Sequence, residues 1–279
     1  MAEQVNKILI TGANGQLGIE LSKLLKGAVL TDVDSLDITD FSAVQNFVRD
    51  HQISTIVNCA AYTNVDGAED NPDLAYKINV TGPENLAKTG CQLVHISTDY
   101  VFDGKSCKPY TPDDILCPLS VYGKTKLEGE KAVLQNALEA IVIRTAWLYS
   151  PYGKNFVKTM LKLGAEKDSI SVVADQIGTP TYAGDLAAAI AKILPQIDTK
   201  TRGIYHFTNE GVCSWYDFAH EIMEEAGLKC KVCPIPSSAY PSKAVRPFYS
   251  VLDKAKIKHT FGIEIKHWKE GLKQCLKQF

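Results

Sequence analysis

The chain has 279 residues, of which 45% are hydrophobic, so it can bury a substantial core as one large domain or as two smaller ones. Its formal net charge of −2 gives no basic excess, which argues against nucleic acid or an anionic membrane as the main partner. No segment approaches the ~18 uninterrupted apolar residues of a membrane span. Residues 1–4 lack the basic and apolar regions of a secretory signal, so we expect a soluble, cytoplasmic protein.

Strand and helix patterns alternate through the first half of the chain. The strands are apolar throughout, and amphipathic helices separate them, which is typical of a parallel sheet covered on both faces. Right-handed crossovers then predict a doubly wound, Rossmann-like α/β fold with ligands at the carboxyl ends of the strands. The expected strands are 7–10, 28–31, 55–59, 93–97 and 140–145, and the expected helices are 18–25, 42–48, 72–88 and 121–134, with a break in the third helix near 81–83.

The second half of the chain is less regular. Helical spacing appears at 155–164 and 184–194, and 170–173 has the pattern of a strand. Ser214 and Asp217 form an S-x-x-D capping box before another apolar helical pattern. Four prolines within 234–247 predict a segment that is mostly loop.

A glycine-rich turn follows the first predicted strand, in the run ILITGANGQLG at residues 8–18. Gly12, Gly15 and Gly18 would let the backbone turn tightly and approach a diphosphate, while the next helix offers free N–H groups and a positive dipole. Asp32 follows about 20 residues after Gly12, the usual offset of a carboxylate that binds ribose hydroxyls. Because no Lys or Arg lies between Asp32 and Arg49 to receive a 2′-phosphate, we expect NADH, with NADPH as the alternative. Otherwise Asp32 merely begins a turn.

Tyr122 and Lys126 lie four residues apart and therefore on one face of a predicted helix. Hydride reduction of a ketone leaves an alkoxide that needs a proton, and a tyrosine with a pKa of about 10 needs a nearby cation to supply it. An isolated pair of this kind would be an ordinary amphipathic pair, but after the glycine turn it indicates a nicotinamide-dependent enzyme. We expect residues 1–148 to form an NAD(P)-binding Rossmann domain, with segments around 170–202 returning to it, and 149–279 to form mainly a smaller, partly discontinuous substrate lobe.

Several segments resemble the extended short-chain dehydrogenases/reductases. Besides the glycine turn and the Tyr/Lys pair, these are NCAA at 58–61 and STD at 97–99. Further runs are similar to one branch of that superfamily, the dTDP-4-dehydrorhamnose reductases. They are AYTNVD at 61–66, STDYVF at 97–102, RTAW at 144–147, NFVKTM at 155–160, DQIGTPT at 175–181 and RP at 246–247.

The resemblance implies reduction of the 4-keto group of dTDP-4-dehydro-L-rhamnose to dTDP-L-rhamnose, with NAD(P)H as hydride donor. The implied catalytic residues are Thr98, Tyr122 and Lys126. The implied cofactor-binding residues are Gly12, Asn14, Gly15, Gln16, Leu17, Gly18, Asp32, Asp37, Ile38, Ala60, Ala61, Thr63, Tyr122 and Lys126. The implied substrate-binding residues are Thr98, Asp99, Trp147 and Arg246. Outside the resemblance, Trp147 also fits a core position and Arg246 a surface ion pair.

The sequence departs from the resemblance at one site. Some members are described as magnesium-linked dimers that use glutamates of the first helix and of the carboxyl-terminal region. Glu20 matches the first position, but the second carries Lys269, with Glu270 about 100° around a helix. We therefore doubt a magnesium site. The eight cysteines and six histidines also show no metal-ligand pattern, although Cys230 and Cys233 have CxxC spacing, so we expect no metal. A homodimer remains open.

Two other functions remain open at this point. The first is a nucleotide-sugar epimerase or dehydratase of the same superfamily, because Asp99 follows Thr98 where a dehydratase needs an acidic residue. Net consumption of NAD(P)H would distinguish a reductase from both. The second is a non-catalytic subunit, because the regulatory subunit of methionine adenosyltransferase resembles the same branch.

Overall fold

The computed structural model describes residues 7–279, so the expectation drawn from residues 1–4 lies outside it. A six-stranded sheet has the order β10-β5-β4-β3-β1-β2, and every pairing in it is parallel. This confirms the Rossmann-like α/β fold, with a sixth strand that the sequence analysis did not anticipate. The strands are β1 (Lys7–Thr11), β2 (Val29–Thr31), β3 (Ile53–Asn58), β4 (Gln92–Thr98), β5 (Ala140–Thr145) and β10 (Gly203–His206).

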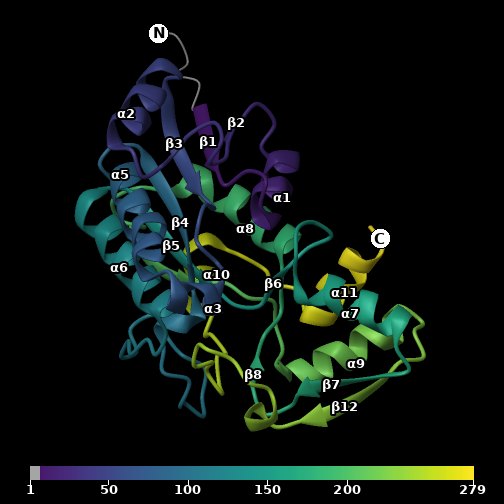
Figure 1. The fold of residues 1–279 in the computed structure, drawn as a ribbon. Coiled ribbons are helices and arrows are strands. Elements are labelled where there is room, and N and C mark those ends of the chain that lie inside the picture. Colours follow the sequence, from purple (N-terminus) through teal and green to yellow (C-terminus); the bar gives the residue numbers. More distant parts are fainter. Residues whose placement is uncertain (1–6) are drawn as a thin grey trace.

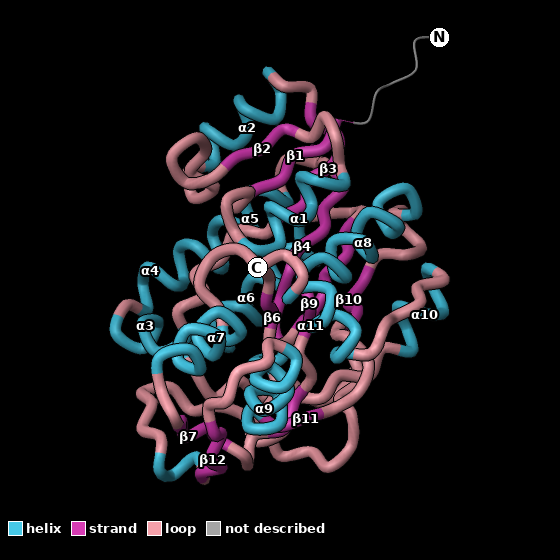
Figure 2. The backbone as a smooth tube through the Cα atoms, turned by 90° about the vertical axis from the view of Figure 1, so that its right-hand side faces the viewer, coloured by secondary structure: helices cyan, strands magenta, loops and turns pink. Residues whose placement is uncertain are grey.

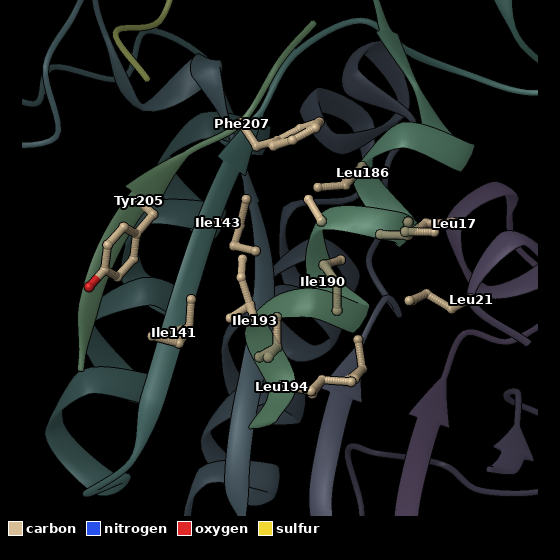
Figure 3. Close-up of a cluster of buried hydrophobic side chains, with 14 of the residues drawn as sticks. Leu17, Leu21, Ile141, Ile143, Leu186, Ile190, Ile193, Leu194, Tyr205 and Phe207 are labelled. Atoms are coloured by element: carbon tan, nitrogen blue, oxygen red, sulfur yellow. The ribbon is translucent and has the colours of Figure 1, made fainter. Parts of the chain in front are cut away.

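Helices cover both faces of this sheet (Figure 1). On one face, α8 packs Leu186 and Ile190 against Ile141 and Ile143 of β5, as Figure 3 shows. On the other face, the intervening Val142 points into a separate cluster. This alternation is what a strand buried on both sides requires. The helices of the first face are α1 (Gln16–Leu24), α8 (Ala183–Ile193) and α10 (Ala255–Phe261), and those of the second are α2 (Phe41–Asp50), α5 (Gly82–Ala87) and α6 (Val121–Asn136).

The expected helix at 72–88 consists of three consecutive pieces. α4 (Pro72–Tyr76) runs into a π-helical turn, η1 (Lys77–Thr81), and then into α5, whose first turn contains Pro83. The predicted break near 81–83 is thus a change of helix type rather than a loop. A short additional helix, α3 (Val65–Asp70), precedes these three.

The helices and strands of a third hydrophobic cluster lie beyond the carboxyl ends of the main strands (Figures 1 and 2). The capping box at Ser214 is confirmed, because both of its hydrogen bonds with Asp217 are present. The segment 234–247 is mostly loop as predicted, except that Pro234 and Ile235 continue β12 in parallel pairing with β7. The cluster contains α7 (Phe156–Glu166), β7 (Ser169–Val173), α9 (Trp215–Glu225), β12 (Lys231–Ile235) and α11 (Trp268–Leu276).

The later segments divide between the main sheet and this third cluster. α8 and β10 pack with the main sheet, while β7 belongs to the third cluster. We propose on this basis that the chain has two interleaved lobes, and the boundary near residue 148 stays a prediction. Within residues 7–279, no helix has both the length and the apolar content to cross a membrane. Short strands complete the structure: β6 (Leu148–Tyr149), β8 (Ile177–Gly178), β9 (Thr181–Tyr182) and β11 (Cys213–Ser214).

Candidate active site

The glycine turn depends on glycines because neighbouring backbone leaves no room for a side chain at two of its positions. Gly12 follows β1 with φ of +64°, and a Cβ there would lie 2.7 Å from the backbone nitrogen of Ala60. A Cβ on Gly18 would lie 2.6 Å from the Cα of Ala13, so α1 approaches the turn only because residue 18 is glycine. Gly15 caps α1 and donates its N–H to the Gly12 carbonyl at 3.0 Å. The cradle fits a diphosphate at a helix N-terminus.

Asp32 lies directly after β2 and beside the glycine turn. Its carboxylate accepts hydrogen bonds from the backbone N–H groups of Asn14, at 3.0 Å, and of Val33, at 2.9 Å. Farther along, hydrogen bonds from the Thr39 hydroxyl and backbone lower the pKa of Asp37. These carboxylates line the same cavity as the glycine turn.

Two buried asparagines hold the loop that follows β3. Asn58 accepts hydrogen bonds from the Thr11 hydroxyl, at 2.7 Å, and from the Ala60 N–H, at 3.1 Å. Asn79, in the π-helical turn, accepts from the Tyr62 N–H at 2.8 Å and donates to the Thr125 hydroxyl at 3.1 Å. Asn79 thereby joins the loop to α6. Our sequence reasoning missed its role, because no spacing in the chain signals it.

Thr98 ends β4 and turns toward Asp99. Its hydroxyl accepts from the Tyr100 N–H at 3.2 Å and lies 3.1 Å from a carboxylate oxygen of Asp99, to which it donates. Asp99 is buried, and this burial raises its pKa to about 7, although hydrogen bonds from Ser250 and Thr98 oppose the shift. A carboxyl group with this pKa can both hold and release a proton near neutral pH.

Tyr122 lies in the first turn of α6, which Ser120 caps by accepting the Gly123 N–H at 3.1 Å. Burial raises the pKa of the Tyr122 phenol, a hydrogen bond with Thr98 opposes the rise, and the charge of Asp99 adds to it. We expected a neighbouring cation to lower this pKa, so the direction differs from the expectation. The reason is that burial, which the sequence does not reveal, outweighs every neighbouring group. The phenol therefore holds its proton at neutral pH.

Lys126 lies one turn beyond Tyr122 and is buried, with 2% of its surface exposed. Its ammonium donates to the Ile96 carbonyl at 2.7 Å. Burial lowers the pKa of Lys126 to about 8, while the negative charge of Glu130 acts in the opposite direction. Glu130 is itself buried and accepts from Arg144 at 2.9 and 2.7 Å.

Trp147 also lines the cavity and offers a flat aromatic surface there. It has φ of +49°, a conformation that costs a non-glycine residue energy and is concentrated at functional sites. Its ring stacks on Trp215 with centroids 3.6 Å apart and planes 12° from parallel. Trp215 was not among the expected site residues, although it stands next to Ser214 of the predicted capping box. The sequence does place an aromatic residue at the start of a predicted helix in the expected substrate lobe, and this could have identified Trp215 as a site residue.

Arg246 forms an ion pair with Asp66 at 2.9 Å and donates to the Tyr100 hydroxyl at 3.1 Å. These two groups raise the pKa of Arg246, although burial alone would lower it. Tyr100 in turn packs edge-on against Tyr122, with ring centroids 5.5 Å apart. Arg246 is therefore in an ion pair, which was one of the two roles predicted for it, and it also lines the cavity.

One cavity of about 980 Å³ brings together every catalytic, cofactor-binding and substrate-binding residue that the sequence analysis named. That volume lies at the upper end of the range for ligand sites. Gln16, at the start of α1, connects the glycine turn to the segment 150–155, because its amide oxygen accepts from Asn155 at 2.9 Å and from Ser150 at 3.2 Å. Lining residues that the sequence analysis did not assign to the site include Tyr100, Lys154, Asn155 and Trp215.

The residues considered for a metal have other partners. The Glu20 carboxylate accepts from Lys23 at 2.9 Å, and the Tyr182 hydroxyl lies 3.4 Å from it. Lys269 donates to Glu221 at 2.6 Å, and Glu270 caps the start of α11. Residues 7–279 contain no group of three or more His, Cys, Asp or Glu side chains placed to hold a metal ion.

A comparison of the sequence with known proteins gives consistent matches over the full length of the chain. The family model described as "RmlD substrate binding domain" matches residues 6–279. The spore coat polysaccharide biosynthesis protein SpsK of Bacillus subtilis is 43% identical over 282 residues, which cover 98% of each chain.

Solved structures match equally well. A dTDP-4-dehydrorhamnose reductase from Clostridium acetobutylicum has a TM-score of 0.94 and 48% identity, and the match covers 98% of this chain and 99% of that one. A dTDP-4-dehydrorhamnose reductase from Bacillus anthracis, in complex with NADP, has a TM-score of 0.93 and 41% identity over the same shares. With its fold, its cavity and these matches, the chain belongs to the RmlD substrate binding domain family, the family of the dTDP-4-dehydrorhamnose reductases.

Proposed function

We propose that this protein reduces the 4-keto group of dTDP-4-dehydro-L-rhamnose to dTDP-L-rhamnose with a hydride from NAD(P)H, with Tyr122 as the general acid. The observation that carries this proposal is the single cavity in which the glycine cradle and the Thr98, Tyr122 and Lys126 side chains meet. Membership of the family supports the substrate class. Because the reaction consumes NAD(P)H, it differs from epimerase and dehydratase reactions, which regenerate their cofactor.

The cofactor end of the cavity fits a dinucleotide. Gly12 and Gly18 let the turn pack directly against the backbone of Ala60 and Ala13, where a Cβ would clash, and the N-terminus of α1 offers backbone N–H groups to a diphosphate. Asp32 would bind the adenosine ribose, so we propose NADH as the preferred cofactor, with NADPH as the alternative. The bound nicotinamide would supply the hydride.

The chain's own residues supply the proton and the charge stabilisation. Tyr122, whose raised pKa keeps the phenol protonated, would donate its proton to the alkoxide that forms at the sugar's C4. The Thr98 hydroxyl would donate a hydrogen bond to the same oxygen as negative charge develops on it. Lys126 would hold positive charge beside the phenolate that remains, and its hydrogen bond to the Ile96 carbonyl fixes the position of the ammonium.

The part of the cavity beside Trp147 and Arg246 would bind the sugar nucleotide. Trp147, held in place by the stacked ring of Trp215, would pack on the apolar face of the deoxysugar. Arg246 would bind the diphosphate, because its planar fork of N–H donors matches phosphate oxygens. Asp99 would accept a hydrogen bond from a sugar hydroxyl or donate one to it.

The test is turnover by Tyr122→Phe, which removes one oxygen and leaves the ring. The kcat for NADH oxidation with dTDP-4-dehydro-L-rhamnose should fall by ~10²–10⁴ while the melting temperature and NADH affinity stay unchanged. Tyr76→Phe is the matched control, because Tyr76 is exposed and lies outside the cavity. Near-normal kcat in Tyr122→Phe at saturating substrate would contradict the assignment of the acid. A wild-type protein that converts the sugar nucleotide without net consumption of NADH would contradict the proposed reaction.

A further inference from the structure

Helix α3 carries three carboxylates, and they contact two segments that each supply a residue to the cavity wall, Arg246 in one and Tyr122 in the other. Asp66 accepts from Arg246 at 2.9 Å, and Asp70 accepts from Lys243 at 2.6 Å. Glu69 accepts the backbone N–H of Val121 at 2.8 Å, immediately before Tyr122. A helix of only six residues thus joins the segment 243–246, which we call the strap, to the start of the catalytic helix α6.

Asp66 fixes the strap at two points. One carboxylate oxygen, Oδ1, accepts the Ala244 N–H at 3.0 Å and so holds the backbone. The other, Oδ2, accepts from Nη2 of Arg246 and holds the side chain. A carboxylate that binds both the backbone and the guanidinium of one short segment restricts the rotamers of that arginine more than a single ion pair would.

Arg246 keeps donors free for a ligand in this arrangement. Within residues 7–279, its hydrogen bonds go to Asp66 and to the Tyr100 hydroxyl, which use two of its five N–H groups. Arg246 lines the cavity, whereas Asp66 does not. Asp66 therefore stands behind the arginine and does not itself contact a ligand in the cavity.

We propose that Asp66 is a positioning residue for sugar-nucleotide binding, which holds Arg246 with its remaining N–H donors directed at the diphosphate. This inference rests on the proposed function, in which Arg246 is the diphosphate ligand. The negative charge of Asp66 would also repel a diphosphate. Because its side chain is 38% exposed, water and salt screen that repulsion, and the loss of orientation outweighs it.

The experiment compares Asp66→Asn with Asp70→Asn. Both changes remove one negative charge from α3 and break one ion pair with the strap, but only the first acts on Arg246. The probe is dTDP, titrated against the fluorescence of Trp147 and Trp215 in the cavity, together with kcat and KM for the keto-sugar nucleotide. Asp66→Asn should raise the dTDP Kd and the KM roughly tenfold, with kcat and the NADH KM unchanged. Asp70→Asn should match the wild type.

Three outcomes would overturn the inference: equal effects in both variants, no effect in Asp66→Asn, or tighter dTDP binding in Asp66→Asn. The last would mean that Asp66 competes with the ligand. If Asp66→Asn melts below the assay temperature, Asp66→Glu replaces it, because it keeps the charge but displaces the carboxylate. Asp66→Glu should raise the dTDP Kd by less than the roughly tenfold increase expected for Asp66→Asn. Wild-type affinity in Asp66→Glu would count against the inference. A wild type that binds dTDP without turning over the keto sugar would contradict the proposed function alone.

Discussion

The charge of Lys126 should set the alkaline limit of this enzyme. Burial lowers the pKa of its ammonium to about 8, so the side chain loses its charge within a range where an exposed lysine stays protonated. The proposed mechanism needs that charge beside the Tyr122 phenolate. The pKa of the phenol itself is raised, so its ionisation does not interfere with measurements in this range.

The expected size of the effect follows from that pKa. About nine-tenths of the molecules carry a charged Lys126 at pH 7, and only about one-tenth at pH 9, so kcat/KM should fall roughly tenfold per unit above pH 8. The assay is NADH oxidation followed from roughly pH 6 to pH 10, with kcat/KM reporting the free enzyme. Lys126→Arg keeps the charge at every pH and should lose this alkaline decline, although its rate will be lower.

Lys124→Met provides the matched control, because Lys124 is exposed on the same helix and should leave the decline unchanged. A wild-type kcat/KM that stays level up to about pH 10 would refute the reasoning, because it would place the lysine at its ordinary pKa. The same decline in Lys126→Arg would assign the titration to another group.

Two further predictions concern carboxylates of the cavity. Asp32 should make kcat/KM roughly tenfold higher with NADH than with NADPH, since two negative groups about 4 Å apart repel by ~1 kcal/mol or more, and Asp32→Ser should narrow that ratio in steady-state kinetics. Equal wild-type values would contradict this. Asp99 has a folded-state pKa of about 7, above the ordinary 3.8. Its contribution to stability is therefore complete below pH 3.8 and lost as the pH rises through 7. Between pH 5 and pH 8 the loss amounts to ~3 kcal/mol, so urea unfolding at these two pH values should show less pH dependence in Asp99→Asn than in the wild type.

The sequence predicts the cofactor end of the site well because that end is local. Gly12, Gly15 and Gly18 lie within seven residues and need only one strand, one turn and one helix to come together. Thr98 and Ala60 follow the ends of parallel strands, and the carboxyl ends of such strands meet at one edge of a sheet. The expected strands there were correct to within a few residues for the same reason.

The rest of the site depends on contacts between residues far apart in the chain. Trp147 and Trp215 stack, and Asp66 pairs with Arg246 across 180 residues, but neither pattern is visible in the sequence. β10 was missed because it is only four residues long, and α8 and α10 bring it into position. The raised pKa of Tyr122 was missed because the sequence identifies its neighbours and not its burial.

Tyr122, Lys126 and Glu130 form a row along one face of α6. Because of this row, α6 should tolerate substitutions on its other face better than insertions or deletions. Successive members are one turn apart, so inserting or deleting a single residue between them would rotate the later ones by about 100° and shift them by about 1.5 Å along the axis. The exposed Lys124, Glu128 and Lys131 on the other face tolerate exchange without moving the row. Sequence drift in this helix should therefore proceed by substitution, while insertions and deletions are confined to the turn after Asn136.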